Sequence, residues 1–241
     1  MKTTFIFFQA VVLLSLSMSF TACNKDRDDD PALTNDEVVA LVEAALQTET
    51  EGVAAESADA AYIADTYTEK SLTMECGQTI DSTVTRTYNN AQATANYVWN
   101  WNWTLNCDQL GLPATIAFGA QSSGSYQTSR MSSNDNMTSN LVIEDLVLGA
   151  NYTLSGAYTR SGSQTSGVRN QNAFTSTLVI EIDDLKVAKG TRRIVSGTAD
   201  FVLTGEGTGG RSFSFEGDII FNNDGTATLV INGMQYTIDL F

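Results

Sequence analysis

The stretch Tyr97-Val98-Trp99-Asn100-Trp101-Asn102-Trp103-Thr104 decides the fold of this chain. Large aromatic side chains alternate here with smaller or polar ones, and this period of two is typical of a β-strand with one face in a core. A surface helix would instead place its apolar residues three or four positions apart. The stretch therefore predicts a sheet whose aromatic face is covered by other parts of the chain.

A second alternating segment, residues 79–88, precedes this strand, and residues 89–92 form a candidate turn between the two. The hairpin register across this turn aligns three pairs on the apolar face: Val84 with Trp99, Ile80 with Trp103 and Cys76 with Cys107. Opposite positions on adjacent strands have Cα atoms close enough for a disulfide. We therefore predict a bond between Cys76 and Cys107.

Further alternating segments follow up to the C-terminus. The pattern predicts strands at residues 115–120, 123–132, 141–148, 151–159, 178–182, 195–203 and 213–221, and turns at 222–225 and 232–233. The pair Asn232-Gly233 is typical of a type I′ turn. In that hairpin, Ile231 pairs with Met234.

Part of the strand region is repeated. Thr138–Glu144 matches Thr175–Glu181, and the short pairs that follow also match: Asp145-Leu146 with Asp184-Leu185, and Ser155-Gly156 with Ser196-Gly197. The repeated unit is a strand, a turn and a returning strand. Repetition of a hairpin favours an antiparallel up-and-down meander over a crossed topology. We predict a mainly β domain over residues 71–241, folded as a curled sheet, an open barrel or a sandwich.

Residues 34–70 have a helical pattern instead. Thr34-Asn35-Asp36-Glu37 is typical of a capping box, and apolar residues with helical spacing follow up to Leu46. Gly52 is a plausible helix stop. A second, Ala-rich helix is predicted from Val53 to about Asp65. Its thin apolar face consists of Ala54, Ala55, Ala58, Ala61 and Tyr62. These segments predict a helical hairpin that packs on the sheet or forms a stalk.

The N-terminus has the features of a secretory signal. Lys2 precedes an apolar run from Phe5 to Leu16, and small residues follow up to Thr21-Ala22. The run is too short for a membrane-spanning helix, so residues 1–22 are predicted to be a signal peptide. Export to an oxidising compartment supports the predicted disulfide.

Phe20-Thr21-Ala22-Cys23 resembles a bacterial lipobox, with Phe20 in place of the usual Leu, and Cys23 is then the acylated residue. The acidic tether, residues 23–33, resembles the export signal of surface lipoproteins of Bacteroidetes through Lys25-Asp26 and the acidic run 28–30. The chain is thus similar to the uncharacterised surface-exposed lipoproteins of that group. This resemblance implies anchoring in outer-membrane lipid through acylated Cys23 and exposure at the cell surface, and it implies no activity.

Composition excludes several classes of function. The formal net charge of -15 disfavours nucleic acid and anionic lipid headgroups as partners. The chain has no His, which removes the commonest general base and the commonest metal ligand. Ser-His-Asp and Cys-His catalysis are therefore excluded.

The aromatic row Trp99, Trp101 and Trp103 is the most suggestive binding feature. Its side chains lie about 6.6 Å apart along the strand, so they could stack on successive sugar rings. Large aromatic side chains more often belong to a core, and the predicted register places the row beside Ile80 and Val84. The core interpretation is preferred, and glycan binding by the row stays open.

A glycosidase would need two carboxylates. The candidates are Glu144, Glu181, Asp183, Asp184, Glu206, Glu216 and Asp218. Glu144 and Glu181 occupy equivalent positions of the repeat, which favours a structural role for them. Neither residues 183–184 nor residues 222–224 have the spacing of a calcium-binding loop. We expect neither a metal site nor a cofactor.

The sequence as a whole predicts a lipid-anchored lipoprotein at the outer-membrane surface that is a non-enzymatic structural or binding module. One alternative is a carrier that holds an apolar ligand in a cavity of the curled sheet. The other is a glycan-binding or glycan-active module. The sequence does not specify a protein or glycan partner.

Overall fold

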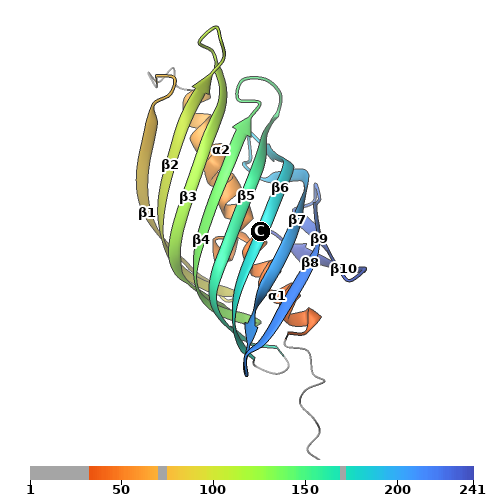
Figure 1. Ribbon diagram of the computed structural model, residues 1–241. Helices are drawn as coiled ribbons and strands as arrows, with labels where there is room; N and C mark the ends of the chain where they lie inside the picture. Colours follow the sequence, from red (N-terminus) through yellow and green to blue (C-terminus); the bar gives the residue numbers. More distant parts are fainter. Residues whose placement is uncertain (1–32, 70–74, 169–171) are drawn as a thin grey trace, which may run out of the picture. The chain divides into compact units, whose positions relative to one another are not determined.

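The computed structural model describes residues 33–69, 75–168 and 172–241. The predicted signal peptide, the lipidation site Cys23 and the tether up to residue 32 lie outside these residues. Two helices and a short 3-10 turn precede ten strands (Figure 1). Their bounds are α1 Asn35–Leu46, η2 Thr48–Thr50, α2 Val53–Glu69, β1 Thr79–Asn89, β2 Ala93–Cys107, β3 Pro113–Thr128, β4 Met131–Glu144, β5 Asn151–Ser166, β6 Ala173–Ala188, β7 Ile194–Gly207, β8 Arg211–Phe221, β9 Thr226–Ile231 and β10 Met234–Asp239.

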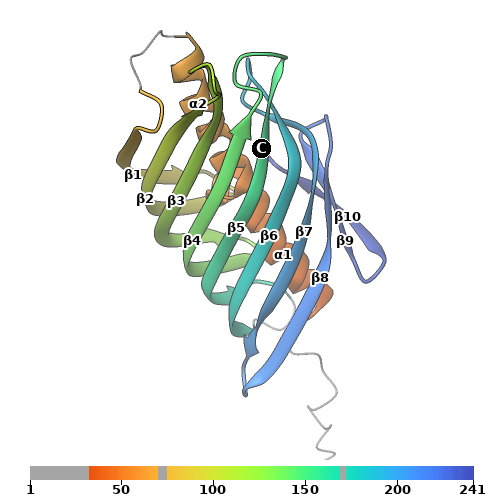
Figure 2. The same ribbon diagram turned by 45° about the horizontal axis from the view of Figure 1, so that its top comes forward.

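The ten strands form one antiparallel sheet in which every strand lies beside its neighbours in sequence. This order confirms the predicted up-and-down meander with an N-terminal helical segment. The sheet is not closed, because β1 and β10 form its two edges. It curls around α1 and α2, which lie along its concave side (Figures 1 and 2).

Burial alternates along the strands and defines the core. In β2 and β4, odd-numbered residues such as Tyr97 and Leu141 are buried, whereas the residues between them are exposed. The buried side chains face the helices, with α1 on β4 and β10 and α2 on β4 to β7. Helices therefore fill the concave side, where a ligand carrier would need its cavity.

The predicted pairing of the first two strands is confirmed. Val84 pairs with Trp99 and Ile80 with Trp103, across a turn between Asn89 and Ala93. The last hairpin also agrees with the prediction, because Asn232 and Gly233 have φ values of 52° and 76°. Two successive positive φ values are the signature of a type I′ turn.

The helices agree with the sequence in part. The capping box is present, since Glu37 N–H donates to Thr34 Oγ1 and Thr34 N–H donates to the Glu37 carboxylate. α1 ends at Leu46, before the predicted stop, and Gly52 instead allows a close approach to the Ala45 carbonyl. Of the described helices, none is long and apolar enough to span a bilayer.

The predicted apolar face of the second helix is wrong at one position. Tyr62 is 53 % exposed and contacts Arg192 at 4.9 Å, whereas the polar residues Glu56 and Asp65 of the same helix are buried. The sheet explains this exchange, because Ser139 and Tyr152 donate hydrogen bonds to the two buried carboxylates.

Two strand predictions also needed correction. The segments 115–120 and 123–132 belong largely to one continuous strand, β3, and β4 ends at Glu144 rather than at Leu148. The internal repeat extends to the backbone, because Asp145 and Asp184 have φ values of 58° and 54°. The repeated sequence thus repeats a local bend as well as a strand.

Candidate functional site

The aromatic row lies on the inner face of β2, which contacts the 3-10 turn η2. Trp99 is 2 % exposed, Trp101 is 9 % exposed and Trp103 is half-buried. The Arg86 guanidinium lies 5.0 Å from the centre of the Trp101 ring. This placement agrees with the core interpretation, and stacking of sugar rings along the whole row would require the helices to move.

The predicted disulfide is confirmed. Cys76 and Cys107 are bonded, with a Cα–Cα distance of 5.7 Å. Cys76 precedes β1 and Cys107 ends β2. The bond therefore fixes the segment before β1 to the end of the neighbouring strand.

A buried polar network, which the sequence analysis missed, lies between the sheet and the helices. Arg160 of β5 donates to the Asp135 carboxylate over 2.9 Å, and its guanidinium also donates to the Tyr97 hydroxyl over 2.6 Å. It further donates to the carbonyls of Ala44 and Thr50. Burial acts to lower the pKa of Arg160, but Asp135 and the neighbouring tyrosines Tyr158, Tyr97 and Tyr126 together outweigh this effect and raise it. The network joins the sheet to the C-terminal end of α1, where a cation is favourable.

Glu56 of α2 forms a second buried contact with the sheet. Its carboxylate accepts a hydrogen bond from the Ser139 hydroxyl of β4. Burial raises the pKa of Glu56 to about 7, although the Ser139 hydrogen bond acts to lower it. A carboxyl group in this position is suited to hold its proton and to bridge two elements.

Arg86 forms a third contact of this kind, near the β1 edge. It donates to Asp59 over 2.6 Å and to Glu51 over 3.3 Å. Burial raises the pKa of both carboxyls, and Arg86 acts to lower it. These three contacts tie the helices to the sheet.

An open groove of about 800 Å³ crosses seven strands near one end of the sheet. Its lining consists of three rows that run across the strands, each with residues that pair from one strand to the next. The central row is Tyr88, Ala95, Tyr126, Ser133, Gln164, Phe174 and Gly207. The side chains of this row are buried or half-buried. The Tyr126 ring contacts the Arg160 guanidinium, and the Phe174 ring packs edge to face with Phe213.

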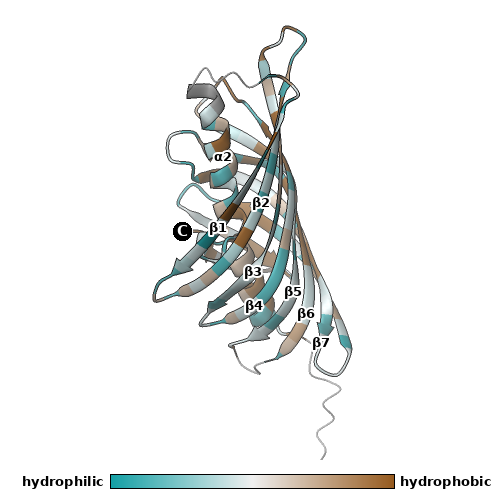
Figure 3. Ribbon diagram, turned by 90° about the vertical axis from the view of Figure 1, so that its left-hand side faces the viewer, coloured by the Kyte–Doolittle hydropathy of each residue, from teal (hydrophilic) through white to brown (hydrophobic). Residues whose placement is uncertain are grey.

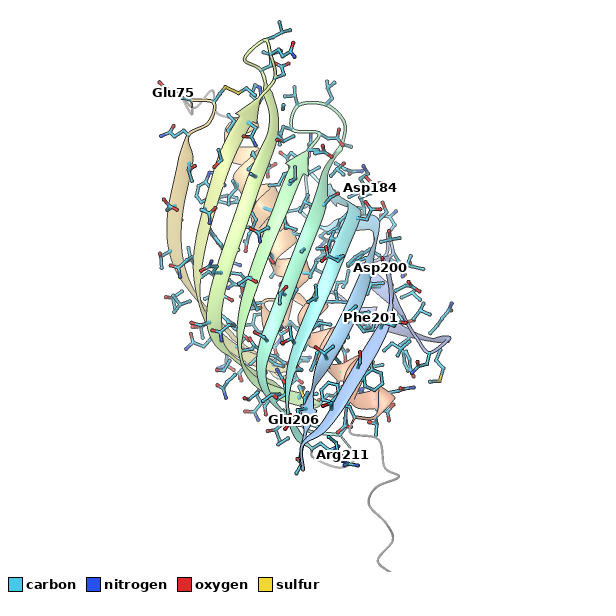
Figure 4. All side chains as sticks on the ribbon, viewed as in Figure 1. Glu75, Asp184, Asp200, Phe201, Glu206 and Arg211 are labelled. Atoms are coloured by element: carbon cyan, nitrogen blue, oxygen red, sulfur yellow. A yellow bond between two sulfur atoms is a disulfide. The ribbon has the colours of Figure 1, made fainter. Side chains whose placement is uncertain are left out.

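The groove is therefore on the convex face, and its floor is backbone. The flanking rows supply its side chains: Thr87, Asn89, Thr94, Asn96, Ser125, Gln127, Ser132, Asn134, Ser163, Thr165, Ala173, Thr175, Glu206 and Thr208. Hydroxyl and amide groups dominate this set. Glu206 of β7 is the one residue with a formal charge among them, and Figure 4 shows it at the lower end of the sheet.

Three glycines allow neighbouring strands to approach closely beside the groove. A Cβ added to Gly124, Gly162 or Gly205 would lie 2.1–2.2 Å from a carbonyl oxygen of the neighbouring strand. The carbonyls belong to lining residues, such as Asn96 and Asn134. Glycine in a strand permits such a close backbone approach.

The carboxylates proposed for a glycosidase do not gather in this groove. Glu206 lines it, whereas Glu181 and Asp218 lie in a different row of the convex face, each directly opposite Asp200. Asp184 forms an exposed ion pair with Lys186 over 2.8 Å. Of the remaining candidates, Glu144 is at the end of β4, Asp183 is in β6 and Glu216 is in β8, and all three are exposed. Within the described residues, no group of three or more His, Cys, Asp or Glu is placed to hold a metal ion.

Comparison with protein-family models, with curated proteins and with solved structures gives no match to this chain. The candidate site is an open groove of hydroxyl and amide groups with one carboxylate, Glu206, on a sheet whose concave side is covered by α1 and α2.

Proposed function

We propose that this protein is a lipid-anchored lipoprotein of the outer-membrane surface, and that its sheet binds an uncharged glycan chain in the convex groove. The groove carries this proposal. It is lined by hydroxyl and amide side chains from seven successive strands, and these groups both donate and accept hydrogen bonds. An extended, hydroxyl-rich ligand matches a long, shallow and polar surface of this kind.

The charge of the groove favours a neutral ligand. Its lining offers no Lys or Arg to an anionic sugar, and Glu206 would repel one. The formal net charge of -15 adds long-range repulsion of polyanions. The aromatic side chains of the central row contact the interior, so recognition would depend on hydrogen bonds. Each such bond replaces one to water, and we expect weak binding per site.

We propose binding rather than catalysis. Hydrolysis of a glycosidic bond by the usual route needs two carboxylates across the bond, and Glu206 alone lines the groove. The carrier alternative is disfavoured because α1 and α2 occupy the concave side of the sheet.

Glycan binding is tested with the full-length protein in detergent on an array of neutral and anionic oligosaccharides. We expect binding to neutral chains only. The double variant Asn96→Ala/Asn134→Ala should weaken that binding by about three- to tenfold per lost hydrogen bond. Asn136→Ala is the matched control, because Asn136 is exposed on the same face of β4 but lies outside the groove. Equal losses in both variants, or no bound neutral glycan, would exclude the proposal.

Anchoring is tested separately. Cys23→Ser should release the protein from the outer-membrane fraction, because the thiol is the proposed site of acylation. If the variant sediments with the membrane as the wild type does, another part of the chain anchors it.

A further inference from the structure

The β1 strand is a long, regular and poorly protected edge of the sheet. Its eleven residues pair with β2 without a register shift, and they include neither Pro nor Gly. Natural edge strands are usually protected by being short or by Pro, bulges and charges. The opposite edge strand, β10, has only six residues. β1 lies at the border of the sheet in Figures 1 and 3. Its two charged residues are Asp81, on the exposed face, and Arg86, whose charge is paired with Asp59 and Glu51.

The hydrogen-bonding groups of this edge can be assigned. Asn90 N–H donates to the Ala93 carbonyl at the hairpin turn. In an antiparallel ladder, every second residue bonds to the neighbouring strand. Since Asn90 does so, the backbone N–H and C=O groups of the even-numbered residues of β1 bond to β2. The N–H and C=O groups of the odd-numbered residues, from Thr79 to Asn89, therefore point away from the sheet. Across the described ranges, no backbone hydrogen bond satisfies them.

The concave face of β1 also has incomplete cover. The side chains of Ile80, Val84 and Tyr88 are only half-buried, in contrast to the fully buried Tyr97 and Trp99 of β2. Val84 and Tyr88 extend the core towards the edge. A further strand beside β1 would cover this apolar surface and satisfy the free backbone groups.

We propose that this strand is supplied by β1 of a second copy of the protein, paired antiparallel about a two-fold axis at Val84. The register that uses all eleven residues pairs Val84 with Val84, Ile80 with Tyr88, Ser82 with Arg86, Asp81 with Thr87 and Thr83 with Thr85. It forms about twelve backbone hydrogen bonds, which is comparable to the roughly ten direct bonds of a typical interface.

Charge and shape select this register. No like charges are opposite, and apolar residues meet on the concave face. A slip of two residues in either direction would place Arg86 opposite Ile80 or Val84. A slip of one residue would bring the wrong backbone groups together and reverse the faces. The edge is thus self-complementary in one arrangement, as a two-fold interface requires.

The register is tested by cross-linking of the full-length protein in isolated membranes. Residue 84 faces its own copy at a non-hydrogen-bonded position, where the Cα atoms are about 4.5 Å apart and suit a disulfide. Under mild oxidation, Val84→Cys should give a dimer as the main species on a non-reducing gel. Ile80→Cys is the control on the same face, because residue 80 meets Tyr88, and it should remain monomeric. Equal cross-linking of both variants, or none of Val84→Cys, would overturn the proposal.

A second experiment measures the mass of the full-length protein in detergent. The wild type should be a dimer, whereas Thr83→Lys/Thr85→Lys should be a monomer because it places Lys opposite Lys. Mixing it with Thr83→Glu/Thr85→Glu should restore a dimer of one copy of each. Both residues are exposed and lie outside the groove, so glycan binding should persist in these variants. A monomeric wild type, or a lysine variant that stays dimeric, would contradict the proposal.

Discussion

Arg160 and Asp135 form an ion pair inside the protein, with 4 % and 0 % of their side-chain surfaces exposed and a distance of 2.9 Å between Nε and Oδ2. A buried ion pair gives little net stability over an apolar pair, because both charges lose their hydration. Here, however, the same guanidinium also donates to the carbonyls of Ala44 and Thr50, next to the C-terminal end of α1. The pair therefore specifies how the helices are placed against the sheet.

Removal of Arg160 alone should be severe. Arg160→Met leaves the Asp135 carboxylate buried without its cation, and we expect a loss of about 3–5 kcal/mol in the free energy of unfolding. Urea denaturation measures this loss. Adding Asp135→Asn should recover part of it, since the uncompensated charge is then gone. Lys186→Met is the control for an exposed ion pair and should cost less than about 1 kcal/mol.

The Trp row gives a second prediction. Trp101→Ala removes a large buried side chain and should cost about 3–5 kcal/mol. Asn102 is exposed on the opposite face of β2, so Asn102→Ala should change stability by about 0.5 kcal/mol at most. Thermal melts of the two variants make the comparison. A mild Trp101→Ala with a severe Asn102→Ala would place the core on the other face of the strand.

The sequence was a good guide to pairing and a poor one to buried polar groups. The candidate turn at residues 89–92 and the spacing of the Trp and Cys residues together predicted the register of β1 with β2, because one face of each strand had to be apolar. The position of Arg160 was a signal for its burial. It lies an even number of residues after Tyr152, Leu154 and Tyr158, so the period of two places it on the buried face of β5.

The groove could not be predicted in the same way. Most side chains of its two flanking rows are ordinary Thr, Ser, Asn or Gln residues on the outer face of a sheet, and they line one groove only when seven strands lie side by side. Gly124, Gly162 and Gly205 lie beside the groove, but they are far apart in the sequence. They form one row only after every strand has its register.

A row of carboxylates on the convex face gives a third prediction. Asp200 lies directly opposite both Glu181 and Asp218, and all three are exposed. Like charges at opposite positions destabilise a sheet by roughly 0.2–1 kcal/mol per pair. Asp200→Asn removes both repulsions and should raise the melting temperature at low salt. The gain should shrink as salt screens the charges. A variant less stable than the wild type at low salt would show that Asp200 has a favourable partner.

Glu56 gives the last prediction, which concerns pH. Burial raises its pKa in the folded protein to about 7, from an ordinary value of 4.5. The folded state thus binds the proton more tightly than the unfolded state, and this contribution to stability is complete below pH 4.5 and is lost as the pH rises through 7. The difference corresponds to about 3 kcal/mol. Glu56→Gln replaces the carboxyl group with an amide of similar shape that does not titrate. The stability of this variant should therefore match that of the wild type near pH 4.5 and exceed it near pH 8. Glu43, Glu51 and Asp59 also have raised pKa values and remain in both proteins, so the difference between the two urea curves isolates Glu56. A constant difference at all pH values would show that Glu56 does not change its protonation on folding.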